Sequence, residues 1–131
     1  MKTVVLDASV GVKWFRDEAG SPEARDLILR HGRGDLSILV PSLFVYEVFA
    51  VASRTLGDDD LSELWSRLLS WRLRVRDVDA ALVPEAVQIR AELGCSLYDA
   101  FAPAVALQAD AVLYSSDAKA HGRWPDVVLL G

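Results

Sequence analysis

The chain has 131 residues, of which 52% are hydrophobic and 25% are charged, a composition that supports a packed core and excludes general disorder. Its single cysteine, Cys95, excludes an internal disulfide and a cysteine-based zinc site, and it fits a reducing cytoplasm. The net charge of −5 argues weakly against a nucleic-acid partner, unless a bound metal cancels the charge of several acids.

Short hydrophobic runs alternate with amphipathic stretches along the whole chain. The predicted strands span residues 2–6, 37–40, 73–78, 111–115 and 127–130. The predicted helices span residues 8–16, 21–30, 42–56, 58–71, 80–93, 96–108 and 117–122. Ser21 and Ser42 are the expected N-caps of the second and third helices. This alternation predicts an α/β fold with a parallel sheet that helices cover on both faces.

The apolar run at the N-terminus is only a few residues long, and Asp7 interrupts it. It is too short for a signal peptide or a membrane span. We therefore expect a cytoplasmic protein without a membrane anchor. The length and the absence of a linker-like segment predict that residues 1–131 form a single domain.

Two acids follow predicted strands. Asp7 comes directly after residues 2–6, and Asp117 follows the run that ends in Ser115 and Ser116. In a parallel sheet, ligands gather at the carboxyl ends of the strands, where both acids would lie. The alternative is that each acid only caps the next helix, and Ser116 could take over that task from Asp117. Ser9, two residues after Asp7, could orient a ligand or a metal-bound water, or could be an ordinary hydroxyl in a first helical turn.

Two more acids lie within predicted helices of apolar character. The neighbours of Glu47 at three and four residues' distance carry no charge, so no local salt bridge compensates it. Asp99 follows Ser96 by three residues, which is a variant capping box, while Tyr98, Phe101 and Ala102 look core-facing. For Glu47 the alternatives are a side chain that reaches solvent at the rim or one that pairs with an arginine from elsewhere in the chain. For Asp99 the alternative is an aspartate that serves only the helix start.

Taken together, the four acids predict one metal site. Carboxylates that converge without a cation raise one another's pKa values, and a hard divalent ion removes that repulsion. An all-oxygen ligand set selects Mg²⁺ or Mn²⁺ over zinc. Such ions typically serve phosphoryl transfer by activating a water and neutralising the phosphate. No Gly-rich Walker loop is present, which argues against a nucleotide triphosphatase.

Four stretches, in this order, resemble the PIN-domain ribonucleases, and specifically the VapC-type toxins of bacterial toxin–antitoxin pairs. They are residues 4–10, residues 40–43 leading to Glu47, residues 97–100, and residues 114–117. Two departures stand out. Ala50 replaces an asparagine that the family often has three residues after the glutamate, and Ser115 replaces the usual threonine of the last motif.

The resemblance implies a three-layer α/β/α fold with a five-stranded parallel sheet. It implies a catalytic, metal-binding set of Asp7, Glu47, Asp99 and Asp117, with hydroxyl support from Ser9 and Ser116. It further implies Mg²⁺- or Mn²⁺-dependent endonucleolytic cleavage of RNA, a homodimer, and inhibition by a small antitoxin protein.

Several basic residues follow Asp7 or Asp117 closely and could contact RNA phosphates at the rim of the site, although a solvated surface explains them equally well. These are Lys13, Arg16, Lys119, His121 and Arg123. Two other functions remain open. An α/β phosphatase or phosphoacceptor domain also uses acids at strand ends, but Ser9 stands where the haloacid-dehalogenase phosphatases need a second aspartate. A catalytically silent PIN-like binding module would have no need for all four acids.

Overall fold

A computed structural model describes residues 1–131 and contains one five-stranded sheet. All of its strand pairs are parallel, and the strand order is β3-β2-β1-β4-β5. The strands are β1 (Lys2–Leu6), β2 (Leu36–Pro41), β3 (Arg74–Arg76), β4 (Val112–Ser115) and β5 (Val128–Leu129). Each predicted strand is therefore present, and the predicted α/β class is confirmed.

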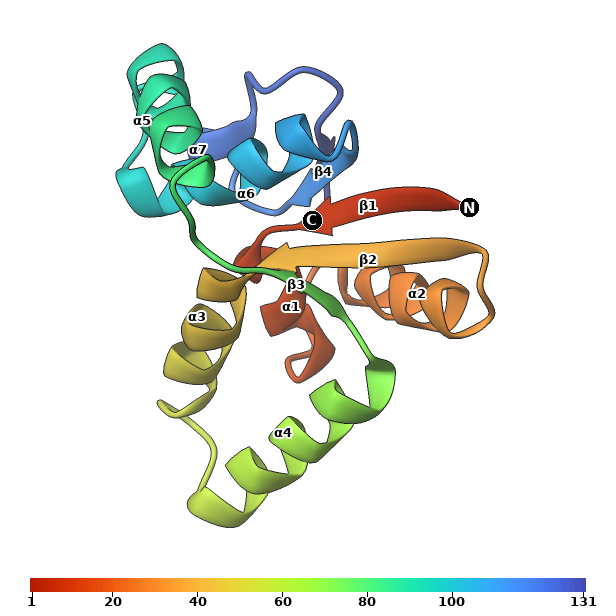
Figure 1. Cartoon of the computed structure of the whole chain (residues 1–131). Helices are drawn as coiled ribbons and strands as arrows, with labels where there is room; N and C mark the ends of the chain where they lie inside the picture. Colours follow the sequence, from red (N-terminus) through yellow and green to blue (C-terminus); the bar gives the residue numbers. More distant parts are fainter.

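Helices cover both faces of this sheet. They are α1 (Ala8–Gly11), a 3₁₀ turn η1 (Val12–Trp14), α2 (Ser21–Gly32), α3 (Ser42–Ala52), α4 (Asp58–Trp71), α5 (Leu82–Leu93), α6 (Leu97–Gln108) and α7 (Ala118–His121). Figure 1 shows α1 to α4 on one side of the sheet and α5 to α7 on the other. The predicted three-layer α/β/α arrangement is thus confirmed.

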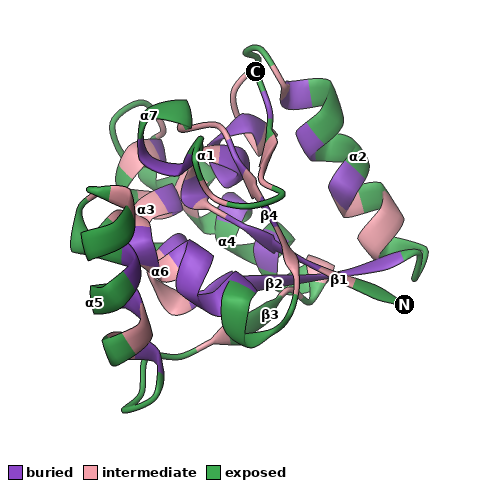
Figure 2. Ribbon diagram, turned by 90° about the horizontal axis from the view of Figure 1, so that it is seen from above, coloured by how far each residue is buried: buried purple, intermediate pink, exposed green.

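The alternation of side chains along the strands separates two hydrophobic cores. Val4 and Leu6 of β1 face the core under α1, α2 and α3, whereas Val5 faces the core under α5 and α6. All three side chains are fully buried, as expected for a central strand covered on both faces. Figure 2 shows the buried residues concentrated in the sheet and on the helix surfaces that face it.

Some helix starts differ from the prediction. Ser21 lies inside α2 and Gly20 is the N-cap, with φ of 88°. The Ser21 hydroxyl instead donates to the carbonyl of Arg16 and accepts from the amide of Glu18, which closes the preceding loop. Ser42 is likewise the first helical residue of α3, because Pro41 continues the strand up to the cap position. The predicted helix over residues 8–16 is divided into α1 and η1.

The apolar stripe of α4 is only partly used for the core. Leu64 and Leu68 are buried against Ala52 of α3, but Trp65 and Leu69 remain 45% and 57% exposed. The apolar residues of α4 therefore divide between a small core shared with α3 and a surface that stays exposed. None of the helices combines the length and hydrophobicity that crossing a bilayer requires.

Candidate metal centre at the carboxyl edge of the sheet

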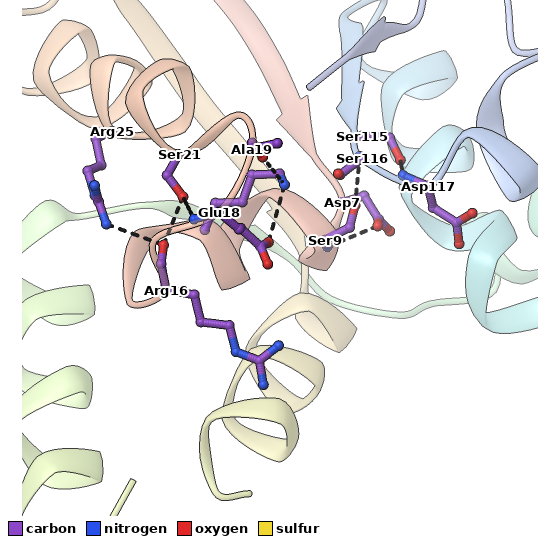
Figure 3. Close-up of polar contacts among 11 residues, drawn as sticks. Asp7, Ser9, Arg16, Glu18, Ala19, Ser21, Arg25, Ser115, Ser116 and Asp117 are labelled. Atoms are coloured by element: carbon purple, nitrogen blue, oxygen red, sulfur yellow. Dashed lines mark hydrogen bonds and ion pairs between the residues drawn. The ribbon is translucent and has the colours of Figure 1, made fainter. Parts of the chain in front are cut away.

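Asp7 and Asp117 lie beside each other because their strands, β1 and β4, are neighbours. The amide of Asp7 donates to the carbonyl of Tyr114 at 3.0 Å, and the amide of Ser116 donates to the Ser9 hydroxyl at 2.9 Å. Figure 3 shows the two acids where these paired segments leave the sheet. Two strand ends that are far apart in sequence are thereby joined, and Ser9 is one of the links.

Both aspartates also cap helices. The Asp7 carboxylate accepts from the amide of Ser9 at 3.1 Å, and the Asp117 carboxylate accepts from the amide of Ala120 at 3.0 Å. The hypothesis that Ser116 caps α7 in place of Asp117 is wrong. Each carboxylate has a second oxygen that this single bond does not use, so the same side chain can cap its helix and bind a metal ion.

Glu47 is brought to Asp7 by the close packing of α1 on α3. A Cβ at Gly11 would lie only 2.5 Å from Phe44 of α3, so a glycine is needed for this approach. Asp7 and Glu47 line the same small pocket, together with Tyr98 of α6. The half-buried Glu47 forms none of the ion pairs of the structure.

Asp99 approaches from the other side of the sheet, in the first turn of α6. Its amide donates to the hydroxyl of Ser96, the N-cap, at 3.1 Å, so the predicted capping residue is present. The positive end of the helix dipole favours the ionised form of an aspartate in this turn. Tyr98 is 68% exposed and does not face the core, contrary to our expectation.

The electrostatics of Glu47 reveal how close these acids are. Burial raises the pKa of Glu47 from an ordinary 4.5 to about 7, with further contributions from the charges of Asp7 and Asp99. The charges of Asp7 and Asp99 therefore act on Glu47, whereas Asp117 neither lines the pocket of Asp7 and Glu47 nor contributes to this shift. A carboxyl group with a pKa near neutrality, inside an acidic pocket, is typical of a functional site.

The chemistry of the donors fits a hard divalent cation, although the side chains are not closed around one. No group of three or more His, Cys, Asp or Glu side chains is arranged so that it could already hold a metal ion. The two strand-end aspartates are turned toward their own helix amides, and Glu47 is destabilised as an anion. Mutual repulsion keeps carboxylates apart, and a cation that neutralises them reverses that effect.

A buried hydrogen-bonded chain lies behind the acids and includes two residues that our sequence analysis did not assign to the site. His121 and Ser115 are both fully buried, and Ser115 Oγ lies 2.7 Å from His121 Nδ1. The amide of Asp117 donates to Ser115 Oγ at 3.1 Å, and His121 Nε2 lies 2.6 Å from the Asp99 carbonyl oxygen. His121 is thus no surface residue, and the hypothesis that it contacts RNA phosphate is wrong.

Lys13 is also buried and cannot reach a phosphate at the rim. Its ammonium donates to the carbonyl of Ala19 at 2.6 Å and to Glu18 at 3.2 Å, and its side chain is 5% exposed. Both acceptors, Glu18 and Ala19, lie in the loop after η1 and are labelled in Figure 3. Lys119 and Arg123 are exposed and Arg16 is half-buried, so for these three the RNA contact stays a prediction.

We expect Lys13→Ala to lower the free energy of unfolding by about 1–3 kcal/mol, because a buried side chain and its hydrogen bonds to Ala19 and Glu18 would be lost. Urea denaturation of the purified chain measures this loss. The control is Lys119→Ala, an exposed lysine whose removal should change the stability by less than about 0.5 kcal/mol. If Lys13→Ala is as stable as the wild type and binds RNA more weakly, Lys13 contacts RNA phosphate at the rim of the site after all.

The family model for the PIN domain matches residues 4–122, and the chain therefore belongs to the PIN domain family. The match spans the segments that carry Asp7, Glu47, Asp99 and Asp117. No curated protein sequence matches the chain.

Several solved structures share the fold over almost the whole chain. VapBC2 from Rickettsia felis, bound to a DNA fragment from its promoter, has 20% identity and a TM-score of 0.74, covering 97% of this chain and 96% of that one. DNA-bound VapBC from Salmonella typhimurium has 20% identity and a TM-score of 0.73, with coverages of 98% and 97%. VapC20 from Mycobacterium tuberculosis, a toxin described as cleaving the sarcin-ricin loop, has 19% identity and a TM-score of 0.72, with coverages of 95% and 98%. The fold is thus that of the VapC-type toxins.

Proposed function

We propose that this protein is a metal-dependent endoribonuclease and the toxin of a type II toxin–antitoxin pair. Asp7, Glu47, Asp99 and Asp117 are the proposed ligands of Mg²⁺ or Mn²⁺. Ser9 and Ser116 belong to the same site, as the proposed hydroxyl support, and residues 1–131 act as one domain in the cytoplasm. The observation that carries the proposal is the acidic pocket in which burial and two neighbouring carboxylates raise the pKa of Glu47 to about 7.

The chemistry of the pocket supports hydrolysis of a phosphodiester. A divalent ion held there would supply an activated water and neutralise charge on the phosphate, so that the P–O bond breaks without a side-chain nucleophile. Asp7 and Asp117 approach from fixed strand ends, while Glu47 and Asp99 approach from helices on opposite faces of the sheet. Glu47 must lose its proton to act as a ligand, so metal uptake near neutral pH releases protons.

The partner assignments rest on the family and on the surface. One similar solved structure is a toxin-antitoxin complex from Klebsiella pneumoniae, and we propose a small antitoxin protein as the partner here. An apolar groove between α3 and α4, lined by Phe44, Trp65 and Leu69 among others, supports it, because exposed apolar surface of this kind usually receives a protein segment. A homodimer is proposed from the family resemblance.

RNA cleavage by the purified chain tests the proposal. Labelled ribosomal RNA and a set of short stem-loops are incubated with Mn²⁺ or Mg²⁺, with and without a chelator. We expect internal cuts that need the ion and stop with the chelator, and no hydrolysis of p-nitrophenyl phosphate. Hydrolysis of that monoester without RNA cleavage would favour the phosphatase alternative. No Mn²⁺ binding in calorimetry would favour a silent binding module.

A further inference from the structure

We propose that His121 is a positioning residue that holds Asp99 and Asp117 at a fixed separation, by filling a hydrogen-bond vacancy that Pro103 creates in α6. The inference rests on the proposed function, since it concerns the same acidic site. It assigns to His121 a role that neither its place in the sequence nor the four acids themselves indicate.

The vacancy follows from the spacing of Asp99 and Pro103. In an α-helix the carbonyl of one residue accepts the amide hydrogen of the residue four positions later. For Asp99 that residue is Pro103, which lies inside α6 and has no amide hydrogen. A buried carbonyl without a partner is costly, and the Nε2 atom of His121 lies 2.6 Å from this oxygen. The imidazole replaces the donor that the proline removes.

The direction of every bond in the chain can then be assigned. A carbonyl oxygen only accepts, so Nε2 must carry the proton and donate to Asp99. In neutral His121 the other nitrogen, Nδ1, is then an acceptor, and the hydroxyl of Ser115 donates to it at 2.7 Å. The oxygen of Ser115 in turn accepts from the amide of Asp117 at 3.1 Å. The three hydrogen bonds therefore all point the same way, from the Asp117 amide through Ser115 and His121 to the Asp99 carbonyl.

This hydrogen-bonded chain joins the backbone of two proposed ligands that belong to different elements. Asp99 lies in α6 and Asp117 at the end of β4, and the two are 18 positions apart in the chain. Because His121 and Ser115 are fully buried, water does not compete for these bonds. Groups behind a metal site that fix its ligands in this way usually influence metal affinity or activity by about 10–100-fold.

The second histidine provides a matched control. His31 also bridges two segments: its Nε2 lies 2.9 Å from the carbonyl oxygen of Trp71, and its Nδ1 accepts the amide of Ile38 at 3.1 Å. It joins α2 to the end of α4 and to β2, and it touches none of the four acids. Loss of His31 should therefore cost stability and nothing else.

The experiment compares His121→Phe with His31→Phe. We expect both to lower the melting temperature, but only His121→Phe to weaken Mn²⁺ binding in calorimetry, by about 10–100-fold. Its kcat for RNA should fall by a similar factor with little change in KM, because the RNA-binding surface stays in place. A His121→Phe variant that loses stability as His31→Phe does, but keeps wild-type Mn²⁺ affinity and kcat, overturns the proposal.

Substitutions of Ser115 break the same hydrogen-bonded chain at a second residue. Ser115→Ala removes the hydroxyl and should weaken Mn²⁺ binding, whereas Ser115→Thr keeps the hydroxyl and should bind as the wild type does. Ser115→Ala and His121→Phe together should cost less than the sum of the two, since both break one chain. If His121→Phe does not fold, the pair of Ser115 variants decides, and equal Mn²⁺ affinities of Ala and Thr would refute the positioning role.

A readout on the metal-free chain separates this inference from the proposed function. Nitrogen-15 spectra should show Nε2 of His121 protonated and Nδ1 bare. The amide of Asp117 should exchange slowly with solvent in the wild type and quickly in His121→Phe and Ser115→Ala. If the chain does not cleave RNA, the proposed ribonuclease function is refuted. The spectra and the exchange rates still show in that case whether His121 holds the segments of Asp99 and Asp117 together. The opposite tautomer, or an Asp117 amide that exchanges equally in all variants, overturns the positioning role alone.

Discussion

Replacing Asp99 with asparagine is expected to abolish RNA cleavage while the chain stays folded. Asparagine keeps the shape of the side chain but lacks the negative charge that a hard divalent cation requires. The backbone bonds of this turn, from the Asp99 amide to Ser96 and from His121 to the Asp99 carbonyl, do not involve the carboxylate. Asp7→Asn should behave in the same way, because asparagine also caps helices well.

The two variants are tested on the RNA substrate that the wild type cuts, at saturating Mn²⁺, with circular dichroism and thermal melts to confirm the fold. The matched control is Asp59→Asn, which removes an exposed aspartate from the first turn of α4. It should cleave RNA as the wild type does. Cleavage by Asp99→Asn and Asp7→Asn at the wild-type rate would contradict the assignment of the site.

Replacing Glu47 with glutamine is expected to stabilise the metal-free protein at pH 8 and to weaken its Mn²⁺ binding. The pKa of Glu47 is raised from 4.5 to about 7, so at pH 8 the folded state carries a charge that its surroundings disfavour. The full shift corresponds to about 3 kcal/mol, and solvent screening of this half-buried group reduces the expected gain to about 1–2 kcal/mol. The melting temperature should rise by a few degrees.

The pH dependence has a definite sign. Between pH 4.5 and about pH 7 the folded state binds a proton at Glu47 that the unfolded state has already released. The contribution of this group to stability is therefore present below pH 4.5 and is lost as the pH rises through about 7. At pH 5 the wild type and Glu47→Gln should consequently melt at similar temperatures, and they should separate as the pH rises.

Melting curves from pH 5 to pH 8 in the presence of a chelator measure this difference. Glu92→Gln is the control, because it removes an exposed glutamate of α5 and should shift the curves equally at every pH. Adding Mn²⁺ should stabilise the wild type more at pH 8 than at pH 6, because the bound form needs ionised Glu47. A Glu47→Gln variant that is less stable than the wild type at pH 8 would count against the convergence of the acids.

Much of the fold could be predicted because it depends on local patterns. The strand over residues 2–6 is visible in the sequence as a short apolar run. Helices and strands alternate along the rest of the chain, and this alternation predicts a parallel sheet. The proximity of Asp7 and Asp117 then follows from geometry, since adjacent parallel strands end at one edge. Glu47 was recognised as a candidate site residue because it is a charge without a local partner in an apolar helix.

The errors arise where tertiary contacts override local sequence. Lys13 and His121 are charged or polar residues near solvent-facing loops, and only the return of the chain brings the carbonyls of Ala19 and Asp99 within hydrogen-bond distance of these two buried side chains. Ser42 has the right residue type for a cap, but the strand before it continues through Pro41. One signal was present and unused: Pro103, four residues after Asp99, indicates a carbonyl that needs another donor.

The most direct measurement is the anomalous diffraction of crystals grown with Mn²⁺. The carboxylates must turn from their helix caps toward a common ion, and we predict an anomalous peak with oxygens of Asp7, Glu47, Asp99 and Asp117 about 2.1 Å away, or bridged to it through water. Density for Mn²⁺ elsewhere, or an empty pocket at millimolar Mn²⁺ with Asp7 and Asp117 still capping their helices, would contradict the account.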